Sequence, residues 1–173
     1  DKEIIIIKAV MKKFSLLFYL KYILTNRKKK RLKMEKAADC LYCQRNELQK
    51  SLMIEMCDLS VSTVFLFKEQ SHPGRCIVAY KDHVNELFEL NEADRNAFMA
   101  DVCKVAEAIS KAFNPVKINY GAYSDKLAHL HIHLVPKYVD GMSYGSTFEM
   151  NPQKTYLSDE EYATTIKKIT DLL

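Results

Sequence analysis

Short runs rich in β-branched and aromatic residues predict strands in the first half of the chain. Three such runs, Leu52–Leu59, Ser62–Phe67 and Cys76–Lys81, are predicted to form antiparallel strands. The apolar pattern changes after Asn91, where large residues recur at spacings of three and four: Phe98, Val102, Val105, Ile109 and Phe113. That spacing predicts a helix with a cap at Asn91 and an end at Asn114-Pro115.

Two more strands and a second helix are predicted after that long helix. The strands are Lys117–Tyr123 and a run of histidines from His129, joined by a short polar turn at residues 124–126. A glycine-containing loop then leads to a C-terminal helix that begins with a capping box of Ser158 and Glu161. The predicted fold class is α+β, with an antiparallel sheet of about five strands, one long helix and a C-terminal helix.

The histidine run, HLHIHLVPKY at residues 129–138, places three of the chain's five histidines at alternate positions. On a strand, one face then carries the leucines and the isoleucine, and the other carries His129, His131 and His133. We expect the aliphatic side chains to be buried and the histidines to face outward. The outer two would lie about 13 Å apart, so one metal ion cannot bind all three. Their strict register favours a chemical role over a chance polar face.

The composition predicts a globular protein of one domain, with 173 residues of which 48% are hydrophobic. The chain has five cysteines, an odd number, and two of them form a Cys-x-x-Cys pair. This argues against a disulfide framework and predicts a reducing compartment, with the cytoplasm as the default. The net charge of +4 is uneven, because residues 1–33 carry +9 and residues 34–173 carry −5.

The basic segment, residues 1–33, contains an apolar stretch at residues 14–24 that Lys21 interrupts. That stretch is shorter than the ~20 residues needed to span a bilayer. A signal peptide is disfavoured because the basic run at 27–31 stands where a cleavage site would need small residues. A basic amphipathic membrane anchor stays open. We expect residues 1–33 to be an extension that is disordered or derived from added or upstream sequence, and residues 34–173 to be the folded domain, without stable membrane insertion.

Three motifs occur together in this chain: DCLYC at 39–43, GRCIVAYKDHVNEL at 74–87 and INYGAYSDKLAHLHIHLVPKY at 118–138. Together they resemble the histidine triad (HIT) family of nucleotide hydrolases and transferases, over about residues 38–140. The segment DGMSYGSTFEMNP that follows is similar to that of a bacterial subgroup of the family. The resemblance implies a HIT-like fold and a homodimer whose sheets join across the two protomers.

The resemblance also implies roles for single residues. His131 stands at the position of the family's nucleophile, and His133 at a position that contacts phosphate oxygens. Neutral imidazole suits nucleotidyl transfer because it is an uncharged nucleophile at pH 7 and a good leaving group afterwards. Asn119, Asp125 and Lys126 stand where members contact phosphate, but the turn holding the last two is one residue shorter than the Ala-Gly-Gln turn of many members. An exposed turn lysine is usually solvated, so a role for Lys126 stays open.

Cys40 and Cys43 have the spacing of half a zinc site, and two other ligands are needed to complete a tetrahedron. In zinc-bearing members of the family these ligands stand at His83 and His129, so the resemblance implies a structural zinc ion. A redox pair is the alternative, and the missing βαβ context disfavours it. With His129 on the metal, the three histidines need not share one task.

We therefore expect an enzyme that hydrolyses the α-phosphate linkage of dinucleoside polyphosphates, such as diadenosine tetraphosphate, or of adenylyl phosphoramidates, through a nucleotidyl-histidine intermediate. Ile132 stands where the uridylyltransferase branch of the family has proline, which favours a hydrolase. The alternatives are a zinc-stabilised nucleotide-binding or regulatory protein with little turnover, and a plain metal-binding protein. No nucleic acid polymer is expected as a partner. Nucleoside preference stays open, because Phe67 stands where members often have an acidic residue for the ribose.

Overall fold

The computed structural model describes residue 21 and residues 38–173, except for 124, 126 and 127. The chain divides into two compact units, Asp1–Asp39 and Cys40–Leu173, and the fold described below is that of the second. The predicted extension, residues 1–33, lies outside the described residues except for Lys21. The predicted start of the domain at Met34 lies outside them as well. No helix in the described part of the chain is long and apolar enough to cross a membrane.

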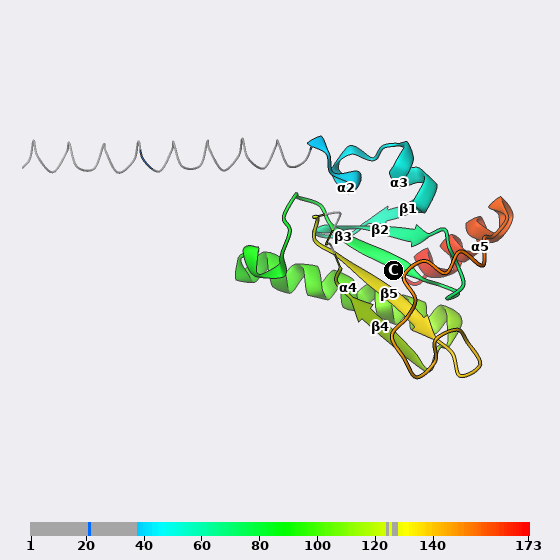
Figure 1. Ribbon diagram of the computed structural model, residues 1–173. Helices are drawn as coiled ribbons and strands as arrows, with labels where there is room; N and C mark the ends of the chain where they lie inside the picture. The colour runs from blue at the N-terminus through cyan, green and yellow to red at the C-terminus, as the bar shows by residue number, and fades with distance from the viewer. Residues whose placement is uncertain (1–20, 22–37, 124, 126–127) are drawn as a thin grey trace, which may run out of the picture. The chain divides into compact units, whose positions relative to one another are not determined.

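A five-stranded antiparallel sheet forms the centre of this unit (Figure 1). Its spatial order is β1-β2-β3-β5-β4, so β5, the histidine strand, lies between β3 and β4. The strands are β1 (Met53–Asp58), β2 (Ser62–Phe67), β3 (Cys76–Tyr80), β4 (Lys117–Gly121) and β5 (His131–Lys137). The predicted α+β fold class with five antiparallel strands is confirmed.

Two helices lie where the apolar spacing predicts them. The long helix α4 (Glu92–Phe113) packs against β2, β3 and β5, and α5 (Asp159–Thr170) packs against α4 and β1 (Figure 1). The Asn91 side chain accepts a hydrogen bond from the Asp94 backbone N–H, which caps α4. Ser158 and Glu161 form the complete capping box of α5.

Three short helices were not predicted: α2 (Leu41–Gln44), α3 (Glu47–Leu52) and the 3₁₀ helix η1 (Leu87–Glu89). Each is six residues or shorter, too short for an apolar period to stand out in the sequence. The helix α2 begins within the Cys-x-x-Cys segment and buries Leu41 and Tyr42. It therefore carries the cysteine pair to the face of the sheet opposite α4.

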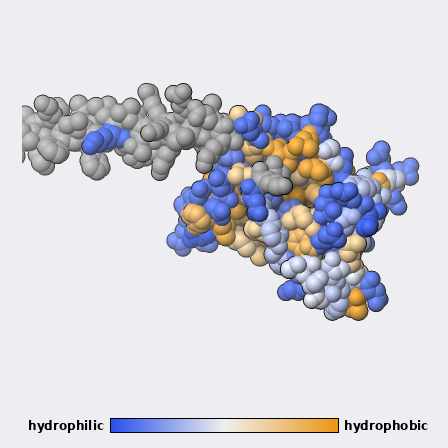
Figure 2. All heavy atoms as spheres, in the orientation of Figure 1, coloured by the Kyte–Doolittle hydropathy of each residue, from blue (hydrophilic) through white to orange (hydrophobic). Residues whose placement is uncertain are grey.

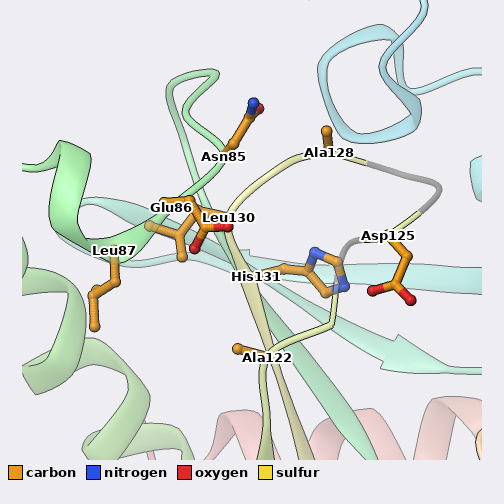
Figure 3. Close-up of a pocket in the computed structure, with 8 residues that line it drawn as sticks. All are labelled: Asn85, Glu86, Leu87, Ala122, Asp125, Ala128, Leu130 and His131. Carbon is orange, nitrogen blue, oxygen red and sulfur yellow. The ribbon is translucent and has the colours of Figure 1, made fainter.

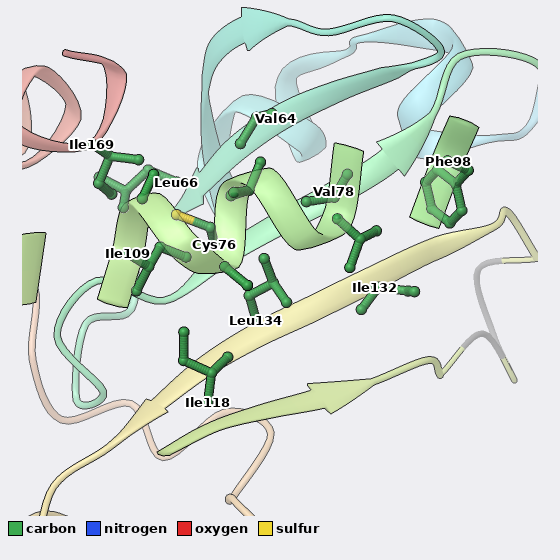
Figure 4. Packing of buried hydrophobic residues seen from close by; sticks show 14 of the residues in the cluster. Val64, Leu66, Cys76, Val78, Phe98, Ile109, Ile118, Ile132, Leu134 and Ile169 are labelled. Carbon is green, nitrogen blue, oxygen red and sulfur yellow. The ribbon is translucent and has the colours of Figure 1, made fainter. Parts of the chain in front are cut away.

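The two faces of the sheet are covered by different apolar clusters. On the α4 side, alternate strand residues pack with residues of α4 and α5 (Figure 4), among them Val64, Leu66, Val78, Ile132, Leu134, Phe98, Ile109 and Ile169. On the other side a smaller cluster joins α2 to β1, β2 and β3: Cys40, Leu41, Tyr42, Met53, Phe65, Phe67, Ile77 and Ala79. In the orientation of Figure 1, apolar residues show over the sheet and hydrophilic residues over α2, α3 and α5 border them (Figure 2).

The three histidines face away from the α4-side core, as expected, and their own side of the sheet is covered as well. Relative exposures are 1% for His129, 4% for His131 and 5% for His133. The Tyr42 ring packs on His129 and His131, and other aromatic rings surround His133. The alternation itself holds, since Ile132 and Leu134 belong to the α4-side cluster. Every residue of β5 is buried.

A buried carboxylate joins α4 to the turn between β1 and β2. Asp101 accepts hydrogen bonds from the Ser60 hydroxyl at 3.0 Å, the Val61 backbone N–H at 3.0 Å and the Ser62 hydroxyl at 2.7 Å. These three donors satisfy the charge that burial would otherwise penalise. The contact fixes the long helix relative to the start of β2.

Candidate functional site

The first histidine, His129, lies just before β5 and faces the cysteine pair. Its Nε2–H donates to the Tyr80 carbonyl at 2.8 Å, so Nδ1 carries the lone pair. That Nδ1 lies 3.3 Å from Cys40 Sγ and 3.6 Å from Cys43 Sγ. Burial lowers the pKa of His129 to about 4, which keeps the imidazole neutral and available as a ligand at pH 7.

Cys40, Cys43, His83 and His129 form a cluster that can hold a metal ion. Their ligand atoms all lie within 4.8 Å of one another, and His83 Nδ1 lies 3.4 Å from Cys43 Sγ. Zinc bonds of about 2.3 Å to sulfur and about 2.0 Å to nitrogen place such atoms roughly 3.5 Å apart in a tetrahedron. The separations and the two-thiolate, two-imidazole donor set therefore fit zinc. The structure brings together all four residues of the predicted ligand set.

The second histidine, His131, begins β5 and has the opposite tautomer. Its Nδ1–H donates to the His129 carbonyl at 2.6 Å, which leaves the lone pair on Nε2. The Tyr42 ring packs on it with 4.8 Å between ring centroids. Burial lowers the pKa of His131, so its imidazole is neutral at pH 7 and its Nε2 is free to act as a nucleophile.

The ring of His131 lines a cavity of about 330 Å³ (Figure 3). The other lining residues come from the start of η1 and the loop before it, from the segment after β4 and from the approach to β5: Asn85, Glu86, Leu87, Ala122, Asp125, Ala128 and Leu130. In Figure 3 the Asp125 carboxylate lies on the side to which the His131 ring points. The structure therefore places Asp125 and His131, both predicted site residues, around one cavity.

The third histidine, His133, lies deeper along β5 and contacts an arginine. Arg75 Nη2 lies 3.3 Å from His133 Nδ1, and the His131 and His133 ring centroids lie 5.1 Å apart. Burial, followed by the positive charge of Arg75, lowers the pKa of His133 to about 3. Aromatic rings surround the imidazole, those of Phe67, Tyr123 and Phe148.

Two further predicted phosphate contacts lie in or near β4. Asn119 pairs with Val135 and Gly121 pairs with His133, so Asn119 lies on the histidine face of the sheet. No hydrogen bond of the Asn119 side chain is seen among the described residues. The remaining predicted contact, Lys126, lies outside the described residues.

Arg75 was missed by the sequence reasoning. It directly precedes β3, and its parity with Ile77, the cross-strand partner of His133, places it on the histidine face. That relation depends on the pairing of β3 with β5, which lie more than fifty residues apart in the chain. The only local signal is a charged residue beside a wholly apolar strand, GRCIVAY.

The fold and this site define a small α+β protein in which a central strand carries two histidines, one of them lining a cavity, and a third histidine just before that strand faces two cysteines. The family model described as HIT domain matches residues 47–140. This chain therefore belongs to the HIT domain family, and the resemblance drawn from its motifs is confirmed.

Two relatives align with most of the chain. Protein hit of Bacillus subtilis (strain 168) is 25% identical over 123 residues, which are 67% of this chain and 83% of that protein. Adenosine 5'-monophosphoramidase hnt1 of Schizosaccharomyces pombe (strain 972 / ATCC 24843) is 22% identical over 139 residues, 74% of this chain and 98% of that protein. Both therefore correspond to this chain over most of their own length.

Two crystal structures of histidine triad proteins share the fold. The protein from Sinorhizobium meliloti 1021 superimposes with a TM-score of 0.69 at 22% identity, over 74% of this chain and 95% of its own. The protein from Marinobacter aquaeolei VT8 gives a TM-score of 0.68 at 17% identity, over 74% and 93%. The architecture described above is therefore that of histidine triad proteins.

Proposed function

We propose that this protein is a nucleotidyl hydrolase that cleaves the α-phosphate linkage of adenylyl phosphoramidates or dinucleoside polyphosphates. The observation that carries the proposal is the hydrogen bond from His131 Nδ1–H to the His129 carbonyl at 2.6 Å. It leaves a neutral Nε2 lone pair beside a cavity of about 330 Å³, which is of a size that accepts a small molecule. The relative named as an adenosine 5'-monophosphoramidase supports the phosphoramidate substrate.

The reaction has two steps. His131 Nε2 attacks the α-phosphorus, a P–N bond to His131 forms, and the P–O or P–N bond to the leaving group breaks with its electron pair going to that group. A water molecule then attacks the same phosphorus and breaks the bond to His131. The products are a nucleoside monophosphate and the protonated leaving group, and His131 returns to its neutral tautomer.

The remaining residues of the proposed site act by positioning and charge, the main demands of phosphoryl chemistry. We assign phosphate-oxygen contacts to His133 and Asn119, which lie on the same face of the sheet as His131. Asp125 lines the cavity, and Lys126 is the next residue in the sequence. On the family resemblance alone, we assign Lys126 the role of supplying a positive charge to the phosphates.

We further propose that Cys40, Cys43, His83 and His129 bind one structural zinc ion. The ligand atoms within 4.8 Å of one another and the donor set support this assignment. When bound, the metal supplies a fixed crosslink between the segment before α2, the loop after β3 and the approach to β5. None of the five cysteines is paired in a disulfide, which supports a reducing compartment such as the cytoplasm.

A homodimer is the proposed assembly, with the two sheets joined across the protomers. The edge position of β4 in the sheet and the exposure of Tyr120, which is 53%, support an interface at that edge. Light scattering coupled to gel filtration tests it, and a Tyr120→Glu variant at the edge should then be monomeric. A monomeric wild-type protein at micromolar concentration would refute the assembly.

The test of the proposed activity is a hydrolysis screen with the purified protein. Adenosine 5'-phosphoramidate, diadenosine tetraphosphate and matched inorganic polyphosphate controls are incubated with it, and release of adenosine monophosphate is measured. Turnover of either nucleotide that is absent in His131→Asn supports the proposal. Binding of nucleotides without turnover of any of them favours the alternative, a zinc-stabilised nucleotide-binding or regulatory protein.

A further inference from the structure

The side chain of Arg75 is the most deeply buried charge near the histidine face. Its relative exposure is 0%, and the described residues include no carboxylate within ion-pair distance of it. Its guanidinium stacks on the Phe67 ring, 4.1 Å from the centroid. Burial lowers the pKa of Arg75 to about 10, and it still carries its charge at pH 7. Burying a charge without an ion-pair partner costs free energy of desolvation. A buried arginine here therefore needs an explanation other than packing.

The guanidinium is held from both ends of its fork. Nη1 donates to the Met150 carbonyl at 2.7 Å, and Nη2 lies 3.2 Å from the Met150 sulfur and 3.3 Å from His133 Nδ1. Beyond Met150, the Glu69 carboxylate accepts from the backbone N–H groups of Lys154 and Thr155. The contacts with Met150 therefore hold the guanidinium with Nη2 toward His133.

An arginine has five donors and no acceptor, which decides the direction of its contact with His133. Nη2–H donates, so His133 Nδ1 accepts and carries the lone pair. The proton of the neutral His133 imidazole then sits on Nε2, because the hydrogen bond made by one ring nitrogen fixes the state of the other. This is the reverse of His131, whose Nδ1–H donates to a backbone carbonyl.

We propose that Arg75 is a positioning residue that holds His133 in the Nε2–H tautomer. His133 Nε2 can then only donate a hydrogen bond, whereas His131 Nε2 carries a lone pair and can attack phosphorus. The two histidines lie on one face of the strand but have opposite tautomers, because His131 Nδ1 contacts a carbonyl and His133 Nδ1 contacts a guanidinium. The inference deepens the proposed function, in which His133 contacts phosphate oxygens: a donor binds an oxyanion, whereas a lone pair at Nε2 would repel it.

The decisive measurement reads the tautomer directly and needs no substrate. The wild-type protein is labelled with ring-¹⁵N histidine, and its spectra assign protonated and unprotonated ring nitrogens at pH 7, with His133→Asn identifying the His133 signals. We expect an unprotonated Nδ1 and a protonated Nε2 for His133, and the reverse for His131. A His133 proton on Nδ1 in the wild-type protein overturns the inference, even if no variant folds.

Arg75→Met and a matched control complete the test. Arg75→Met should leave His133 as a mixture of tautomers and lower kcat at least about tenfold with little change in KM. The control is Lys137→Met, which removes another buried cation, at the end of β5, whose side chain donates to the Ser143 and Ser146 carbonyls instead. It should leave the His133 tautomer unchanged.

Two results overturn the inference: an unchanged His133 tautomer in folded Arg75→Met, or an equal change of tautomer in Lys137→Met. Failure of the proposed function gives a different pattern. If the protein has the expected tautomers but hydrolyses no nucleotide, the positioning of His133 by Arg75 is supported. Only the proposed reaction is then refuted.

Discussion

Replacing His131 with asparagine distinguishes its role in catalysis from its contribution to the stability of the fold. The asparagine amide can donate to the His129 carbonyl in place of the ring N–H, which lies 2.6 Å from that oxygen. What is lost is the ring contact with Tyr42, at 4.8 Å between centroids, and part of a buried volume. We expect the free energy of unfolding to fall by about 1–2 kcal/mol, a drop of roughly 3–8 °C in Tm.

The effect of His131→Asn on turnover should be far larger, because no ring nitrogen remains to attack phosphorus. We expect kcat to fall at least about 10⁴-fold, which corresponds to about 5.5 kcal/mol of activation free energy, while nucleotide affinity stays within a few-fold. Steady-state hydrolysis and calorimetric binding measure the two quantities. Wild-type protein quenched within one turnover should carry an acid-labile nucleotidyl adduct on the peptide that contains His131.

The matched control for this variant is His72→Asn, the same change at a buried histidine that does not line the cavity. It should leave kcat within a few-fold of the wild-type value. Near-wild-type hydrolysis by His131→Asn, or an adduct on another peptide such as the one containing Cys103, would refute the assignment of the nucleophile.

Four other results are expected. Deleting residues 1–33 should leave the Tm and the activity nearly unchanged, and a loss of folded protein would instead indicate that the domain needs this segment. Metal analysis should find one zinc per chain, and Cys43→Ala should lose the metal and lower the Tm, whereas Cys103→Ala, at an exposed thiol, should do neither; a metal-free wild-type protein would contradict the site. Because the pKa of His133 is about 3 when folded and 6.5 is its ordinary value, the folded state favours the neutral ring; its contribution to stability is complete above pH 6.5 and is lost as the pH falls toward 3. The difference in unfolding free energy between wild type and His133→Asn should shrink over that range, by on the order of a few kcal/mol, and a constant difference would refute the depressed pKa. Asp101→Ala should lower the free energy of unfolding by about 2–4 kcal/mol in urea denaturation, since three donors lose one carboxylate, and a change below 0.5 kcal/mol would argue against that contact.

The two main helices were predictable because their apolar periods are long and their caps are local, and the first three strands because their β-branched and aromatic residues form distinct runs. The interval from Glu92 to Phe113 is one example, since Asn91 and Asn114 bound it in the sequence as they do in the structure. The helices α2 and α3 were not predictable, because four to six residues show no period and tertiary packing decides their form.

The candidate site divides in the same way. The metal-ligand cluster could be proposed from the motif resemblance, and the four residues lie together in the structure. The burial of the histidines could not be predicted, since it depends on residues far away in the chain: Tyr42 covers His129 and His131, and Phe67 is one of the rings around His133. Arg75 escaped notice for a related reason: its role depends on the register between two strands, and register is a property of the assembled sheet.

The position of β5 in the middle of the sheet has a consequence for how the molecule moves. Its backbone is hydrogen-bonded to β3 on one side and β4 on the other, and all its side chains are buried. Amide protons in such a strand exchange with solvent only through openings that approach global unfolding. The rings of His131 and His133 are therefore attached to the part of the chain that opens least often, and their relative spacing persists through the microsecond-to-millisecond motions in which loops rearrange. The strand is therefore the least mobile support that this fold offers to the two rings.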